Sequence, residues 1–176
     1  MSDGETKDGL LATLRAERAG WEALLEEIGS DRFEAPGVAG DWSVKDVLAH
    51  LAAYQRAWSA RLRWAATGVP PTPREMFDVE ALPDDVGTWT TDRQNAAIHA
   101  QYAPLPPPVV LAIWRETFDR LTEGVAALPE EALTTLGRFP WAGHRSLAEA
   151  MAGDTYRHAR EHAADVRAWL GRVDAS

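Results

Sequence analysis

The sequence of 176 residues contains no cysteine. This absence excludes disulfides, thiolate-ligated metal sites and a cysteine nucleophile, so any thiol chemistry needs a thiol from outside the chain. Basic residues are also fewer than acidic residues. The sequence has 18 Lys and Arg and 27 Asp and Glu, so its net charge is −9. Since phosphate groups are bound by cations, this balance predicts no nucleic-acid partner and no affinity for an anionic membrane surface.

Long hydrophobic runs are missing as well. No apolar stretch approaches the ~20 residues of a membrane span, and residues 1–5 show no basic region followed by an apolar one. We therefore expect a cytoplasmic protein. What the chain does have is a globular composition, 45% hydrophobic and 26% charged, over the length of one ordinary domain. We expect a single domain that spans residues 1–176.

Hydrophobic residues recur at three- and four-residue spacing in four long segments, which predicts four amphipathic helices. They are expected at about residues 7–28, 44–67, 109–127 and 147–170. The second helix has Ser43 as its N-cap and Asp46 at its third position, which is a capping-box pattern. Ser146 and Glu149 form the same pattern before the fourth helix. There is no convincing strand alternation.

The connection between the second and third helices, residues 69–108, is long and irregular. Its recurrent prolines exclude a long helix, and only one or two helical turns are expected, at residues 92–101. Long ordered connections are usually functional or cover something. Short loops favour antiparallel neighbours, whereas this one long connection permits a crossover. The chain is therefore predicted to be an all-α four-helix bundle.

Two histidines on the predicted fourth helix, His158 and His162, are four residues apart and therefore share one face. This spacing allows two imidazoles to chelate one metal ion, although such a pair also occurs as solvated or aromatic-packed side chains. Asp154 lies one turn before His158 and could accept a ring N–H, as carboxylates behind metal ligands do. The alternative is that Asp154 only caps the helix or faces water.

A third ligand is available in the middle of the second helix, where His50 lies among apolar residues. The alternative for His50 is a buried histidine with no metal. Tyr54, one turn further on, is a candidate to orient a nucleophile or donate a proton, or else is a core aromatic residue. His99 and His144 lie outside the long helices, and we expect both to be exposed.

Two strings of the sequence resemble a known family. Residues 40–51 (GDWSVKDVLAHL) resemble the second-helix signature of the DinB-like superfamily of four-helix bundles, and residues 154–162 (DTYRHAREH) resemble its fourth-helix signature. The resemblance implies an up-down-down-up bundle in which His50, His158 and His162 bind a divalent metal, with zinc or nickel expected first. The run from Trp89 to Asn95 followed by Tyr102, together with residues 165–170 (DVRAWL), looks most like the ClbS/DfsB branch.

Members of this superfamily transfer a low-molecular-weight thiol, use it as a cofactor, or hydrolyse a reactive ring in a genotoxin. The resemblance therefore implies a metal-dependent enzyme that acts on a small electrophilic molecule by thiol transfer or hydrolysis, for detoxification or self-resistance, with an external thiol as a candidate cofactor. The alternatives are a non-catalytic protein that sequesters a small molecule and a structural bundle with incidental histidines. We also expect a homodimer, from the superfamily and from the eight tryptophans.

Overall fold

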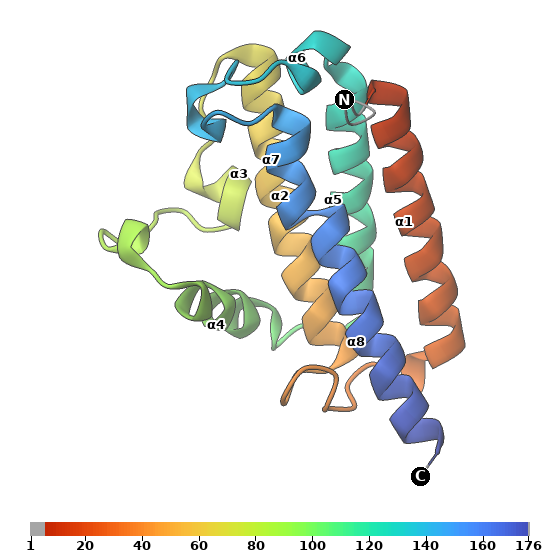
Figure 1. The fold of residues 1–176 in the computed structure, drawn as a ribbon. Helices are drawn as coiled ribbons and strands as arrows, with labels where there is room; N and C mark the ends of the chain where they lie inside the picture. Colours follow the sequence, from red (N-terminus) through yellow and green to blue (C-terminus); the bar gives the residue numbers. More distant parts are fainter. Residues whose placement is uncertain (1–5, 176) are drawn as a thin grey trace.

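Four long helices form a bundle in the computed structural model, which describes residues 6–175 (Figure 1). These helices are α1 (Lys7–Ile28), α2 (Val44–Thr67), α5 (Pro107–Ala127) and α8 (Tyr156–Asp174). α1 and α8 run in one direction, whereas α2 and α5 run in the other (Figure 1). The predicted all-α bundle with up-down-down-up order is thus confirmed. Within residues 6–175 the only extended pairing is the isolated bridge between Ala39 and Trp42.

Shorter elements connect the long helices. They are the helices α3 (Pro73–Phe77), α4 (Thr91–Tyr102), α6 (Glu130–Thr134) and α7 (Leu147–Asp154), and the 3₁₀ turns η1 (Ser30–Arg32), η2 (Val86–Thr88) and η3 (Pro140–Ala142). α3 and α4 belong to the long connection and lie beside α2, outside the bundle (Figure 1). The connection therefore returns the chain to the start of α5, so that α2 and α5 run parallel.

Local sequence determines where α2 begins and ends. The Ser43 hydroxyl accepts a hydrogen bond from the Asp46 backbone N–H, and the Asp46 carboxylate accepts one from the Ser43 N–H at 2.9 Å, which completes the predicted capping box. At the other end Gly68 has a φ of 73°, a left-handed conformation that favours glycine. Between these caps α2 carries His50 and Tyr54 at fixed positions on one face.

The predicted fourth helix is broken in two, and the prediction of one continuous helix from residue 147 is wrong in this respect. Thr155 separates α7 from α8 with φ −122° and ψ −103°, and its buried hydroxyl donates to the Met151 carbonyl at 2.8 Å. The apolar face continues across the break, because Ala152 and Ala159 are both buried. Periodicity alone could not detect an interruption of one residue. α8 also continues to Asp174, beyond the expected end at residue 170.

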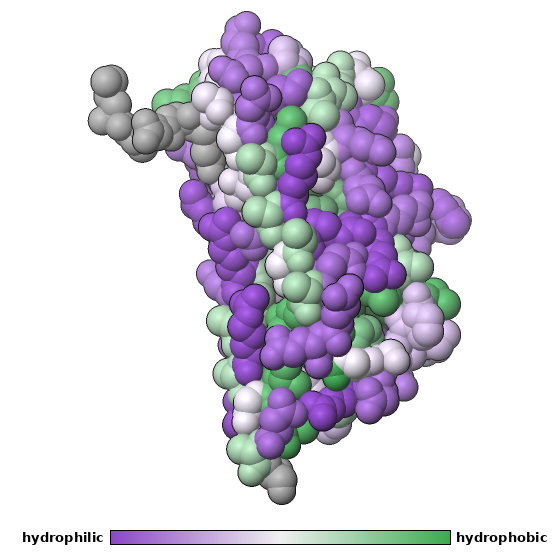
Figure 2. Space-filling view, turned by 90° about the vertical axis from the view of Figure 1, so that its right-hand side faces the viewer, coloured by the Kyte–Doolittle hydropathy of each residue, from purple (hydrophilic) through white to green (hydrophobic). Residues whose placement is uncertain are grey.

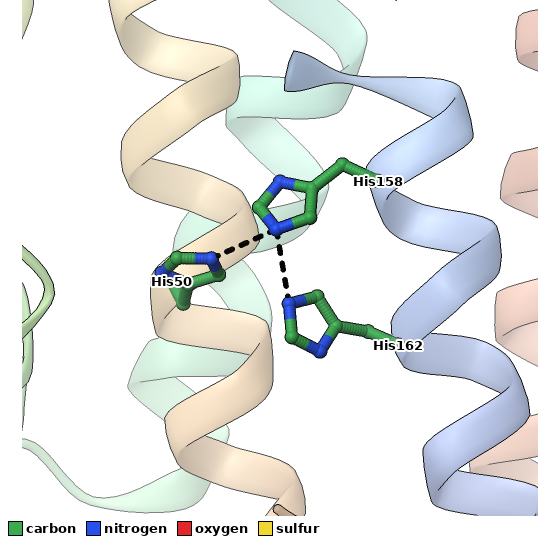
Figure 3. A group of neighbouring side chains, drawn as sticks. All are labelled: His50, His158 and His162. Carbon is green, nitrogen blue, oxygen red and sulfur yellow. Dashed lines mark hydrogen bonds between the residues drawn. The ribbon is translucent and has the colours of Figure 1, made fainter. Parts of the chain in front are cut away.

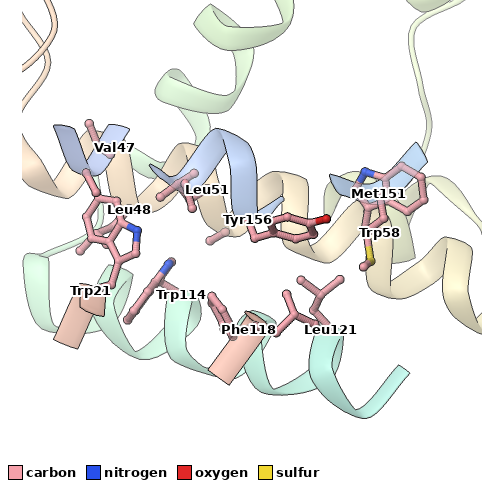
Figure 4. Close-up of a cluster of buried hydrophobic side chains, with 14 of the residues drawn as sticks. Trp21, Val47, Leu48, Leu51, Trp58, Trp114, Phe118, Leu121, Met151 and Tyr156 are labelled. Atoms are coloured by element: carbon pink, nitrogen blue, oxygen red, sulfur yellow. The ribbon is translucent and has the colours of Figure 1, made fainter. Parts of the chain in front are cut away.

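The core lies between the four long helices and contains large aromatic side chains (Figure 4). Trp21 of α1 and Trp114 of α5 have ring centroids 6.2 Å apart, and Phe118 packs at 5.9 Å from Trp114. All three side chains are buried. Burial of such large rings contributes much of the hydrophobic stabilisation of the bundle. This rigid packing fixes the α2 and α8 faces that carry the histidines.

Hydrophilic side chains cover most of the face shown in Figure 2, with apolar residues in a narrow band between them. None of the helices within residues 6–175 has the length and apolar character needed to cross a membrane. Residues 1–5, on which the expectation of no leader segment was based, lie outside the described residues.

Candidate metal centre

Three histidines from two helices converge at one point (Figure 3). His50 comes from the middle of α2, and His158 and His162 come from successive turns of α8. The Nε2 atom of His158 lies 3.1 Å from Nε2 of His50 and 3.0 Å from Nε2 of His162. The three nitrogens, one from each ring, all lie within 4.8 Å of one another.

This spacing fits a single metal ion. Ligands that are 2.0–2.1 Å from one tetrahedral zinc ion are about 3.3–3.4 Å apart. Two of the three pairs are within a few tenths of an ångström of that value. Three imidazoles with no thiolate suit zinc, nickel, copper or iron better than magnesium or calcium. The residues present therefore fit a three-histidine site with further positions left for water or substrate.

The surroundings of these rings keep them neutral. Burial lowers the pKa of His50 to about 3, and the nearby His158 and His162 contribute to this shift. Burial also lowers the pKa values of His158 and His162, although carboxylates near them act in the opposite direction. A neutral imidazole offers a lone pair to a metal, whereas a protonated one does not. The three rings are thus in the ligating form at neutral pH.

His158 has a hydrogen-bond partner just before the break at Thr155. The backbone carbonyl of Asp154 accepts a hydrogen bond from the His158 ring. Because Nε2 of His158 faces the other histidines, the donating atom is Nδ1, and this bond fixes the tautomer with a free lone pair on Nε2. The Asp154 carboxylate instead accepts a hydrogen bond from Nε1 of Trp58 at 3.0 Å. The acceptor for the His158 ring is therefore the Asp154 carbonyl, whereas the sequence suggested the Asp154 carboxylate.

Tyr54 lies beside the three histidines, as its position on α2 predicted. Its ring centroid is 4.8 Å from that of His50 and 5.1 Å from that of His158. Burial, and then the charge of Asp154, raise the pKa of Tyr54 above its ordinary value. Tyr54 is therefore a phenol at neutral pH and is able to donate a hydrogen bond into the site.

The site opens into a cleft of about 270 Å³. Its lining consists of the three histidines and of Ala39, Trp42, Tyr54, Thr91 and Asn95. Thr91 and Asn95 are one turn apart on α4, so the crossover connection supplies one wall of the cleft. Sequence patterns did not assign Trp42, Thr91 and Asn95 to the site, although the run from Trp89 to Asn95 was one of the motifs that carried the family resemblance.

The other two histidines do not join the site. His99 stacks on Trp42 with ring centroids 6.2 Å apart, and its Nε2 lies 3.4 Å from the Asp46 carboxylate. His144 is exposed, as expected. Neither belongs to the group of nitrogens that could hold one ion.

The sequence is similar to a known protein family and to a curated protein. The model of the mycothiol maleylpyruvate isomerase N-terminal domain family matches residues 14–170. An uncharacterized protein of Mycobacterium tuberculosis, found in two strains, is 26% identical over 168 residues, which cover 93% of this chain and 57% of the relative. The chain thus spans little more than half the length of this curated relative.

Two solved structures share the fold. One is DfsB, a sibling lethal factor precursor, with a TM-score of 0.74, 16% identity and coverage of 95% of this chain and 96% of that chain. The other is the colibactin self-resistance protein ClbS, with a TM-score of 0.73, 13% identity and coverage of 97% and 98%. Both show that this chain shares their fold.

The ClbS structure also corrects one prediction, because it is a complex with double-stranded DNA. Our exclusion of a nucleic-acid partner was therefore wrong. The physical reason is that net charge is a sum over the whole molecule, whereas phosphate groups are bound by local arrangements of donors. An overall charge of −9 does not exclude such an arrangement.

Proposed function

Since this chain belongs to the mycothiol maleylpyruvate isomerase N-terminal domain family, we propose that it is a divalent-metal-dependent enzyme acting on a small electrophilic molecule. The observation that carries the proposal is the convergence of the Nε2 atoms of His50, His158 and His162 at a cleft. Zinc or nickel is the proposed ion. The physiological task that we propose is detoxification or self-resistance, by analogy with ClbS, which is a self-resistance protein.

A divalent ion in this position supplies a Lewis acid that promotes ionisation of a water or thiol at neutral pH. The chain's own residues prepare the site for this. The Asp154 carbonyl holds the His158 ring in its ligating tautomer, and burial keeps all three rings neutral. Tyr54 keeps its proton at neutral pH, and its role in the proposal is to donate that proton, or a hydrogen bond, to a substrate atom.

A thiol nucleophile would have to come from outside the chain, because the sequence has no cysteine. We propose two routes, which are attack by water and attack by a low-molecular-weight thiol such as mycothiol, bacillithiol or glutathione. The family description favours the thiol, since its namesake is a mycothiol-dependent isomerase.

The test is a turnover assay with styrene oxide, whose strained ring is opened by either nucleophile. Metal-free, zinc-loaded and nickel-loaded protein are assayed with and without each thiol. We expect turnover only with metal, a loss of at least about a hundredfold in His162→Ala, and wild-type rates in the matched control His144→Ala. Binding without turnover would favour a sequestering protein instead. Equal rates in wild type and His162→Ala would contradict the proposal.

A further inference from the structure

We propose that Asn95 and Trp42 form a recognition subsite for an uncharged amide group attached to a flat apolar body. This inference rests on the proposed function for the reaction, and it names the class of molecule that the cleft accepts. Its evidence comes from two residues that are not metal ligands, Asn95 on α4 and Trp42 just before α2.

The first observation is the charge of the cleft. Apart from the histidines, its lining is made of Ala39, Trp42, Tyr54, Thr91 and Asn95, none of which is ionised at neutral pH. No lysine or arginine lines it, so a carboxylate at the outer end of a ligand would lose its hydration without gaining an ion pair. An uncharged ligand avoids this cost.

The second observation is an unsatisfied polar atom. Oδ1 of Asn95 is inaccessible to solvent and has no hydrogen-bond partner among residues 6–175. Buried polar atoms are nearly always hydrogen-bonded, and leaving one unpaired is unfavourable. Asn95 lines the cleft, so a turn of its amide group about χ2 would bring Oδ1 to a donor on a ligand there. The asparagine amide offers one acceptor and two N–H donors, which matches a carboxamide of opposite orientation.

The third observation is a fixed aromatic wall. The ring of Trp42 stacks on His99 at an interplanar angle of 18° and meets the His50 ring with centroids 5.2 Å apart. These two contacts hold the indole in one orientation beside the cleft. A flat apolar body can pack against such a ring with little loss of its own conformational freedom.

Together these features describe a ligand that lies against Trp42, pairs its amide with Asn95, and presents its reactive end to the three histidines. Asn95 would touch the ligand and not the metal. Its replacement should therefore change which ligands bind and leave metal affinity unaltered.

Three shape-matched probes test this inference, namely benzamide, benzoate and benzamidine, which are neutral, anionic and cationic. Their dissociation constants are measured by ligand-observed NMR with the metal-free 176-residue chain at pH 7.5. We expect wild type to prefer benzamide, and Asn95→Leu to weaken benzamide at least about tenfold. Asn95→Asp should reverse the preference in favour of benzamidine.

The matched control is Gln101→Glu, which makes the same amide-to-carboxylate change at an exposed position of α4. It should keep the preference for benzamide. The inference is overturned if wild type shows no preference for benzamide, if Asn95→Leu binds it as wild type does, or if Gln101→Glu behaves like Asn95→Asp.

Zinc affinity of the same variants separates this inference from the proposed function. Asn95→Leu should bind zinc as wild type does, which also shows that it is folded at the site. If wild type binds no zinc, the proposed function fails, while the probe preferences in metal-free protein still decide the role of Asn95.

Discussion

At the scale of single residues, burial of uncharged histidines makes the stability of the metal-free protein depend on pH. The pKa of His50 is about 3 in the folded chain, against 6.5 for an unburied histidine. Between these values the unfolded chain binds a proton that the folded chain does not. The free energy of unfolding should therefore fall as pH decreases from 6.5, by up to about 1.4 kcal/mol per pH unit for one such histidine. Above pH 6.5 this effect is absent.

Urea denaturation at pH 7.5, 5.5 and 4.5 measures this dependence. His50→Leu removes one of the buried titrating rings, so its stability should fall less steeply with decreasing pH than that of wild type. His144→Ala removes an exposed ring and should follow wild type. Parallel curves for His50→Leu and wild type would contradict the assigned cause.

The contact of His158 with a backbone carbonyl gives a second prediction at the residue scale. Asp154→Asn keeps that carbonyl and retains an acceptor for the Trp58 indole, so zinc affinity should fall by less than about tenfold. Isothermal titration calorimetry measures the change. A loss toward a hundredfold would show that the carboxylate itself supports the ligand, as the sequence suggested.

At the scale of helices, the contact between α2 and α5 depends on one glycine. A Cβ atom built on Gly124 of α5 would lie 3.0 Å from Cδ1 and 3.1 Å from Cβ of the fully buried Leu62 of α2. Gly124→Ala should therefore destabilise the protein by about 1 kcal/mol, because crowding exceeds the gain in helix propensity. The control is Gly171→Ala in α8, where nothing lies within 4 Å.

Gly171→Ala should stabilise the protein by up to about 1 kcal/mol, since only helix propensity changes. Thermal denaturation of both variants makes the comparison. Equal stabilisation by the two substitutions would mean that α2 and α5 are not packed as tightly as the structure shows.

The helices also show what sequence can and cannot predict. Periodicity and caps predicted α1 and α2 closely, because the signals at Ser43 and Asp46 are local. Thr72 and Glu75 form a similar capping box at the start of α3, but the prolines around them argued against a helix there. The break at Thr155 left the apolar pattern intact and therefore gave no signal.

At the scale of the whole molecule, some features of the site could be predicted from the sequence and others could not. Helix spacing predicted that His158 and His162 share one face, and the family resemblance implied that His50 joins them. The positions of Trp42, Thr91 and Asn95 in the site were not predictable. Thr91 and Asn95 depend on how the long connection folds back against α2, and Trp42 depends on how the segment before α2 folds. Such non-local packing cannot be inferred from periodicity.

The homodimer stays a prediction. One of its reasons was that eight tryptophans exceed what one small core hides. In the structure none of them is fully exposed, since four are buried and four are partly buried within a single chain. The remaining reason is the family resemblance. Sedimentation velocity at micromolar concentration measures the oligomeric state, and a clean monomer would contradict the expectation.

We propose that three histidines hold one divalent ion, and zinc binding tests this proposal most directly. Protein purified without a nickel column is titrated with zinc at pH 7.5, where all three rings are neutral. We predict one zinc per chain in wild type and in His144→Ala, and an affinity at least about tenfold lower in His162→Ala, which loses one of three ligands. Equal affinity in wild type and His162→Ala would contradict the account.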